Sequence, residues 1–201
     1  WWLGGAWLWL MWGSASLAVV ALNYLGFGAR GFAMRRDGRM AWAARVLTAP
    51  YRAGAALNAW LWTRTLPAAA EIAPGLRLGR RPSTREWHAA GRPRIVSLCA
   101  ELEVRPDSAA SRDVSCLPML DLVTPTAPQL HRAGRMVADA VRCSDTGVWV
   151  CCALGFSRSA ATAASARSRS PLLATITGST TRRVTPCAAR RSATASTISA
   201  V

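Results

Sequence analysis

Hydrophobic and polar positions divide the chain into regions of different pattern. Residues 1–29 contain no charged side chain, and the first charge is that of Arg30. An apolar stretch of this length can cross a bilayer as one helix. Tryptophans are concentrated in its first half, and Tyr24 and Phe27 lie near its other end, as is usual for aromatic rings at membrane interfaces. We therefore predict a transmembrane helix that ends near 26–28.

The segment 30–65 is first basic and then apolar. Five arginines lie between positions 30 and 45, against one acid, Asp37. Excess arginine beside a span marks its cytoplasmic side, so the rest of the chain is expected in the cytoplasm. The run from Val46 to Trp62 contains one charged residue, Arg52. It predicts either a helix on the membrane surface or a second span, and Arg52 favours the surface helix.

The N-terminal apolar stretch has a second interpretation, a cleaved signal peptide. A signal peptide needs a basic start, a shorter apolar core and a small-residue cleavage site. The basic start is missing, and we therefore favour a retained anchor. The chain begins with Trp1 rather than methionine, which we interpret as a fragment or an incomplete gene.

Strand-like and helix-like patterns alternate in the second half of the chain. Residues 66–79 are rich in Pro, Ala and Gly and predict a linker into a domain that covers 73–164. The alternation predicts an α/β fold, a sheet flanked by helices. The expected strands cover 76–78 at the sheet edge, 94–98, 114–120 and 148–151, and the expected helices cover 83–90 and 125–141.

The segment 165–201 differs in composition from the domain before it. Ser, Thr, Ala and Arg make up 27 of its 37 residues. Such a segment cannot bury enough apolar surface to offset the entropy of ordering it. We interpret it as out-of-frame translation of a GC-rich gene, with a natural disordered extension as the alternative.

Charge and cysteine spacing narrow the classes of partner. All 25 basic residues are arginine and the net charge is +15, which favours phospholipid head groups or phosphorylated substrates. No aromatic-basic motif occurs and the arginines are scattered, so no nucleic-acid partner is expected. Neither His88 nor His131 lies at ligand spacing from a cysteine pair, so no metal site is expected.

The most informative motif is Cys152-Ala-Leu-Gly-Phe-Ser-Arg158, which is followed by Ser159 and preceded by the apolar run 148–151. A thiolate, loop amides and a guanidinium are the groups needed to bind and attack a phosphate dianion. A helix N-terminus and nearby cations lower the pKa of a thiol, and a guanidinium can bond two phosphate oxygens. Gly155 permits a tight curl. The predicted phosphate loop comprises Ala153, Leu154, Gly155, Phe156, Ser157 and Arg158.

This motif after an apolar strand resembles the signature of the cysteine-dependent protein tyrosine phosphatases, and Ala-Leu-Gly-Phe-Ser-Arg-Ser-Ala most resembles their dual-specificity subgroup. Leu117-Pro118-Met119-Leu120-Asp121 is similar to that family's general-acid loop, with Asp121 placed 31 residues before Cys152. The resemblance covers about 73–164. The order of anchor, linker and domain also resembles bacterial membrane-associated members, which implies an inner-membrane location with a cytoplasmic catalytic domain.

The resemblance implies a role for each of four residues. Cys152 would attack phosphorus and form a phosphocysteine, while Arg158 and the loop amides would stabilise the equatorial oxygens. Asp121 would protonate the leaving oxygen and then deprotonate water, and Ser159 would assist breakdown of the intermediate. The implied activity is hydrolysis of phosphomonoesters, on phosphotyrosine or phosphoserine/threonine of proteins or on phospholipid head groups, without metal or organic cofactor.

Two features depart from the family's pattern. Cys151 occupies the position where the family usually has histidine, and its side chain is expected on the opposite face of the strand from Cys152. The chain also offers a short helix after Ser159 where the family has a long apolar one. The alternative function is therefore a catalytically inactive or truncated membrane protein that retains the phosphate-binding loop. Glu101 and Glu103, which follow a strand, are expected at the surface.

Overall fold

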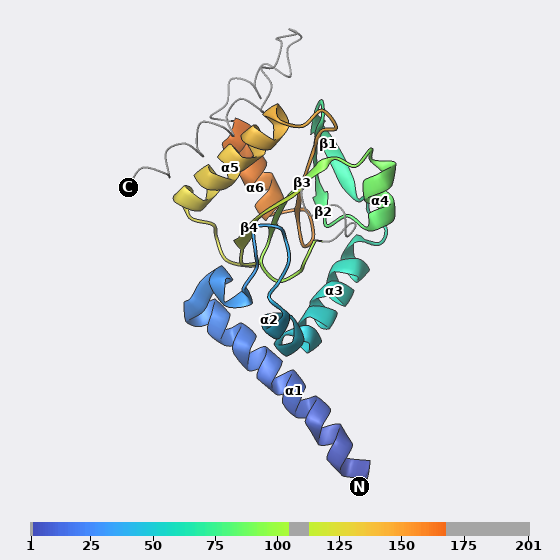
Figure 1. Ribbon diagram of the computed structural model, residues 1–201, viewed down its shortest axis with the longest axis vertical. Helices are drawn as coiled ribbons and strands as arrows, with labels where there is room; N and C mark the ends of the chain where they lie inside the picture. The colour runs from blue at the N-terminus through green and yellow to red at the C-terminus, as the bar shows by residue number, and fades with distance from the viewer. Residues whose placement is uncertain (1, 105–112, 168–201) are drawn as a thin grey trace, which may run out of the picture.

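The structure, a computed structural model, describes residues 2–104 and 113–167. A mixed α/β domain carries an apolar N-terminal helix that projects away from the sheet (Figure 1). The α/β class predicted from the sequence is therefore confirmed. Of the predicted tail 165–201, the first three residues end a helix, and the part from 168 onward lies outside the described residues.

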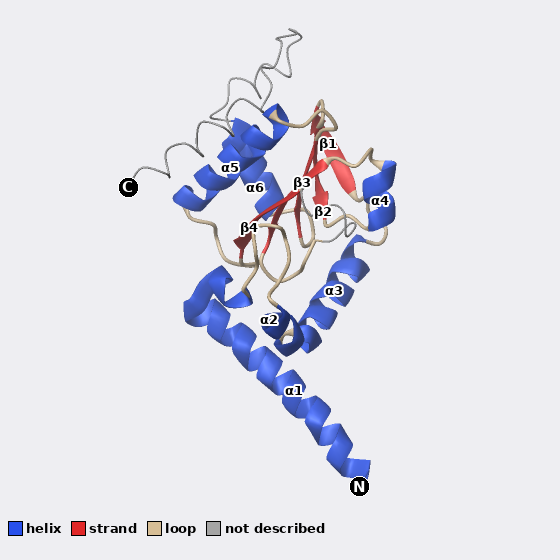
Figure 2. Ribbon diagram, viewed as in Figure 1, coloured by secondary structure: helices blue, strands red, loops and turns tan. Residues whose placement is uncertain are grey.

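Five strands form one sheet in the order β1-β2-β5-β3-β4 (Figure 2). Strands β1 and β2 pair antiparallel, and the other three neighbouring pairs are parallel. Since parallel strands end at the same edge, the carboxyl ends of β5, β3 and β4 lie side by side. The strands are β1 Ala69–Ala73, β2 Leu76–Arg80, β3 Arg94–Cys99, β4 Val114–Met119 and β5 Val148–Cys152.

Helices cover both faces of this sheet. Alternate residues of β5 point to opposite sides: Val150 and Cys152 pack under α5 and α6, whereas Trp149 and Cys151 pack with Trp87 of α4. The opposite orientation predicted for the two cysteines is thus confirmed. The helices are α1 Trp2–Leu22, α2 Trp42–Leu47, α3 Ala49–Thr63, α4 Thr84–Ala89, α5 Ala127–Arg142 and α6 Arg158–Arg167.

The predicted linker 66–79 is instead part of the sheet. It forms β1 and most of β2, which meet in a hairpin at Gly75, where φ is +73°. The run 76–78 is a strand as predicted, but it lies between β1 and β5 rather than at the sheet edge. Alanine has low strand propensity, so Ala69–Ala73 owes its conformation to its pairing with β2.

Helix α1 continues through a π-helical turn, Asn23–Phe27, and a 3₁₀ turn, Gly28–Phe32. Among the described residues, the stretch Trp7–Phe32 is the single helix long and apolar enough to cross a membrane, by length and composition. The second apolar run, Val46 to Trp62, includes the end of α2 and most of α3. Helix α3 has 15 residues, fewer than the roughly 20 that a span needs.

The N-terminal helices pack on the carboxyl ends of the strands. Phe32 and Met40 form an apolar cluster with Ala100, the residue after β3. Glu103, expected at the surface, is buried, because its carboxylate accepts the backbone N–H of Met40 at 2.8 Å and pairs with Arg52 at 3.2 Å. The buried carboxylate of Glu103 therefore links the segment 30–65 to the α/β domain.

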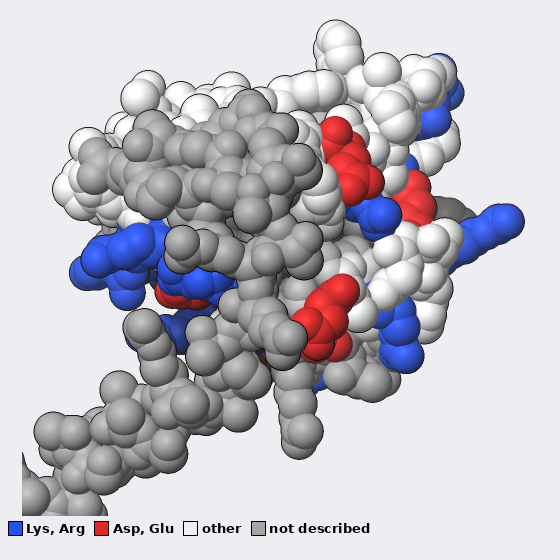
Figure 3. Space-filling view, turned by 90° about the horizontal axis from the view of Figure 1, so that it is seen from above, with Lys and Arg blue, Asp and Glu red and all other residues white. Residues whose placement is uncertain are grey.

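Charged side chains of both signs occur together on the described surface seen from above (Figure 3). Arg80 pairs with Glu86, and Arg77 lies 3.9 Å from Glu71. Neighbouring acids therefore partly offset the charges of Arg77 and Arg80 in β2.

Candidate functional site

The loop 153–157 joins the carboxyl end of β5 to the start of α6 (Figure 1). Cys152 is the last residue of β5, and Arg158 is the first residue of α6. Ligands of open α/β sheets bind outside the carboxyl ends of the strands. The fold therefore places the motif where such a sheet binds its ligands.

The Cys152 thiol lies at the centre of the loop. Its residue is 2% exposed, and its Sγ accepts the N–H of Gly155 at 3.2 Å and lies 3.7 Å from the hydroxyl of Ser159. The Ser159 hydroxyl in turn donates to the carbonyl of Gly155 at 2.9 Å. The structure thus brings together three residues that the sequence assigned to one site, and the Gly155 N–H can stabilise a thiolate.

Gly155 is required by both its conformation and its surroundings. Its φ is +88°, and an added Cβ would lie 2.5 Å from the backbone N of Arg80 and 2.5 Å from the carbonyl carbon of Gly79. The loop is therefore pressed against the end of β2, where no side chain fits. This agrees with the tight curl predicted from the sequence.

We expect Gly155→Ala to lower the free energy of unfolding by more than Gly91→Ala does. Both glycines have a positive φ, +88° and +83°, but a Cβ on Gly91 would meet nothing within 4 Å. The two variants share a backbone cost of about 1 kcal/mol, and Gly155→Ala adds overpacking of about 1–3 kcal/mol. Urea denaturation of both variants checks this, and equal losses would contradict the close approach of loop and strand.

Arg158 does not extend freely into solvent as a phosphate clamp. The residue is 2% exposed, its Nη1 donates to Glu101 at 3.2 Å and to the carbonyl of Met119 at 2.6 Å, and its Nη2 lies 3.1 Å from Asp121. Its Nε is buried and has no hydrogen-bond partner within the described residues. Burial lowers the pKa of Arg158, but the surrounding carboxylates and thiols outweigh it, and the net pKa is raised. The guanidinium therefore stays cationic.

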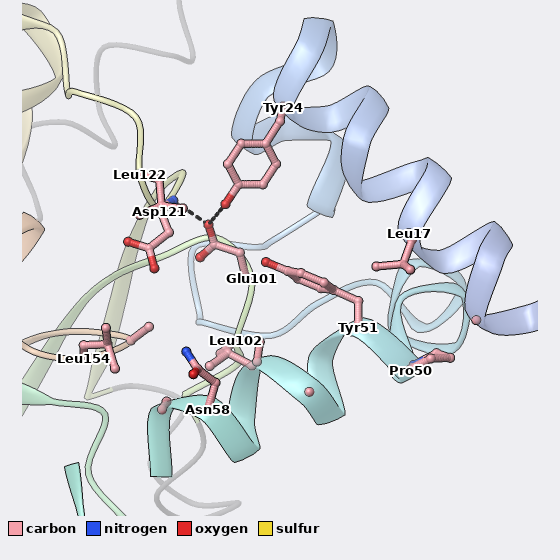
Figure 4. Close-up of a pocket in the computed structure, with 15 residues that line it drawn as sticks. Leu17, Tyr24, Pro50, Tyr51, Asn58, Glu101, Leu102, Asp121, Leu122 and Leu154 are labelled. Carbon is pink, nitrogen blue, oxygen red and sulfur yellow. Dashed lines mark hydrogen bonds between the residues drawn. The ribbon is translucent and has the colours of Figure 1, made fainter. Parts of the chain in front are cut away.

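Glu101 is a site residue that the sequence analysis placed at the surface. It is 2% exposed, because it follows β3 at the sheet edge where Arg158 lies. Its Oε2 accepts from Arg158 at 3.2 Å and from the Cys99 thiol at 3.3 Å, and its Oε1 accepts the Asp121 N–H at 2.7 Å and the Tyr24 hydroxyl at 3.2 Å (Figure 4). The sequence held one signal for Glu101 as a site residue, namely a carboxylate that follows a predicted strand.

Asp121 lies two residues beyond β4, beside the guanidinium of Arg158. Its carboxylate contacts Arg158 at 3.1 Å, and its side chain is 35% exposed. The next residue, Leu122, has a φ of +57° and is 98% exposed, a conformation that costs free energy in a non-glycine residue. The Asp121 carboxylate is thus held near the loop and remains open to solvent.

Cys151 has no part in this cluster. Burial raises its pKa well above the usual range for a thiol, so it stays protonated among Trp87, Ile95 and Trp149. No group of three or more His, Cys, Asp or Glu side chains that could hold a metal ion occurs in the described part of the chain.

Comparisons with protein-family models, curated proteins and solved structures find no match for this chain.

Proposed function

We propose that this protein is a membrane-anchored cysteine phosphatase of the dual-specificity type. It would hydrolyse phosphomonoesters through a phosphocysteine intermediate, with its α/β domain in the cytoplasm of a bacterial cell. One observation carries the proposal: a buried thiol that receives the Gly155 N–H and lies beside Ser159, at the carboxyl end of a strand, six residues before a buried arginine. The resemblance of the motif to that family supports it.

The geometry supports a division of roles. Cys152 attacks phosphorus as a thiolate, and the N-terminus of α6 adds positive potential at the loop. The unpartnered Nε of Arg158 leaves one buried N–H for a phosphate oxygen. Asp121 donates a proton to the leaving oxygen, and Ser159, 3.7 Å from the thiol, assists its departure when water cleaves the intermediate. No metal ion or organic cofactor takes part.

One observation favours the second candidate, an inactive membrane protein that only binds anions. Both terminal nitrogens of Arg158 are held by protein acceptors, including the carboxylates of Glu101 and Asp121. A phosphate dianion would have to displace Asp121 or bind through Nε and the second N–H of Nη2. An arginine held by protein carboxylates in this way can bind an anion without supporting hydrolysis of a phosphate ester.

Hydrolysis of a generic aryl phosphate by the full chain in detergent micelles separates the two candidates. We expect turnover that vanadate inhibits, because vanadate occupies the phosphate site of the thiolate. Vanadate binding without turnover would support the anion-binding protein, and neither binding nor turnover would contradict both.

We expect Asp121→Asn to slow hydrolysis according to the leaving group. Loss of a general acid costs about 10²–10⁴-fold for poor leaving groups and little for p-nitrophenolate, which departs unprotonated. Steady-state kinetics over a series of aryl phosphates checks this, with the exposed Asp145→Asn as the control. A loss of equal size for every leaving group would contradict the assignment of Asp121 as the acid.

A further inference from the structure

A cavity of about 470 Å³ lies between α1, α3 and the candidate site (Figure 4). Its volume is within the range of roughly 300–1,000 Å³ that is usual for small-molecule sites. One end is formed by Asp121 and by Ala153 and Leu154 of the phosphate loop, and the other by Gly13 and Leu17 of α1. The cavity thus runs from the loop that follows the thiol to the helix able to span a membrane.

The walls of the cavity are suited to a hydrocarbon chain. Helix α3 contributes small side chains at Gly54, Ala55 and Ala59, and these leave room along the helix. Two of the polar groups, the Tyr24 hydroxyl and the Glu101 carboxylate, are hydrogen-bonded to each other. A peptide chain would need many further polar partners for its backbone, whereas an alkyl chain needs none.

The apolar surface continues beyond the cavity. On α1, the side chains from Trp7 to Met11 are each more than 60% exposed. Leu122, which also borders the cavity beside Asp121, is exposed and apolar. A molecule that leaves a bilayer along α1 would therefore meet mostly apolar side chains, with Tyr24, Tyr51 and Asn58 among them, before it reaches Asp121 and the loop.

We propose that the substrate is a lipid phosphomonoester, with its phosphate at Cys152 and its hydrocarbon chain in the cavity between α1 and α3. The inference rests on the proposed phosphatase function and names its substrate class. The phosphate meets the cationic, buried Arg158, and the chain meets the small residues of α3. The span then serves to bring the site to its substrate as well as to anchor the protein.

Hydrolysis of n-alkyl phosphates from ethyl to octyl by the full chain in lipid nanodiscs tests this proposal. Burial of each CH₂ should raise kcat/KM by roughly twofold to fourfold. Gly54→Leu should lower the octyl-to-ethyl ratio of kcat/KM at least about tenfold, because a Cβ at Gly54 meets nothing within 4 Å and the leucine side chain can occupy the cavity.

Ala53→Leu is the matched control, because Ala53 is exposed on the same helix and does not line the cavity. It should keep the wild-type ratio, and partition of substrate into the bilayer is the same for both variants. A ratio near one in the wild type, an unchanged ratio in Gly54→Leu, or a phosphotyrosine peptide hydrolysed faster than octyl phosphate overturns the lipid assignment while the phosphatase function stands. Absence of hydrolysis for every substrate, p-nitrophenyl phosphate included, overturns the proposed function and this inference with it.

Discussion

Cys152→Ser is expected to lower phosphatase activity by about 10⁴-fold or more. A serine hydroxyl at this position would receive the same contacts from Gly155 and Ser159, but its pKa is far too high for those contacts to ionise it, so no nucleophile forms. The side chain is nearly isosteric, and the fold should be unchanged. The measurement is kcat for an aryl phosphate, together with mass spectrometry of acid-quenched enzyme, which should detect a phosphorylated Cys152 only in the wild type.

The adjacent thiol provides the matched control. Cys151 packs on the opposite face of the sheet, among Trp87 and Trp149, so Cys151→Ala should keep activity within about tenfold while it destabilises the fold by about 1–2 kcal/mol. A slip of one residue in β5 would exchange the faces of the two cysteines. Loss of activity in Cys151→Ala with retention in Cys152→Ser would therefore refute the assignment of the nucleophile.

Local patterns were sufficient to predict most of the α/β domain. The predicted strands at 94–98, 114–120 and 148–151 agree within about two residues with β3, β4 and β5, since apolar runs bounded by polar residues are visible without tertiary information. The starts of helices α4 and α5 also depend on local sequence. Ser83 and Thr126 each form a capping box with the residue three positions later.

Features that depend on distant residues could not be predicted in this way. Glu101 is buried because Arg158 lies opposite it, 57 residues away in the sequence, and an isolated glutamate predicts a surface position. Strand β1 exists through its pairing with β2. The cavity has no local signal at all, because α1, α3 and the loop meet only in the folded chain.

Glu101→Gln is expected to lower the free energy of unfolding by about 3 kcal/mol. The carboxylate accepts four hydrogen bonds, two on each oxygen, from Tyr24, Asp121, Cys99 and Arg158. A glutamine amide must present its nitrogen to one pair of these donors, so that one side of the group meets a donor instead of an acceptor. Arg158 also loses a charged partner inside the protein, although it keeps Asp121 and the Met119 carbonyl.

The same substitution should also impair catalysis. With Glu101 neutral, the guanidinium is less firmly positioned at the end of β4, and a displacement of about 1 Å at a reacting group costs about 10²-fold in rate. Activity is therefore measured at a temperature at which the variant is still folded, where kcat should fall and the Gly155 and Ser159 contacts to the thiol should persist. A merely structural role would leave kcat of the folded variant unchanged.

Glu71→Gln is the matched control for both measurements. Glu71 is a half-exposed glutamate of β1 that faces Arg77 at 3.9 Å, and an exposed pair of this kind contributes only about 0–1 kcal/mol. Urea denaturation of the full chain, followed by tryptophan fluorescence, gives the free energies. If the two variants lose stability equally, Glu101 is not the residue that holds Arg158, and the site must owe its geometry to Asp121 and the Met119 carbonyl alone.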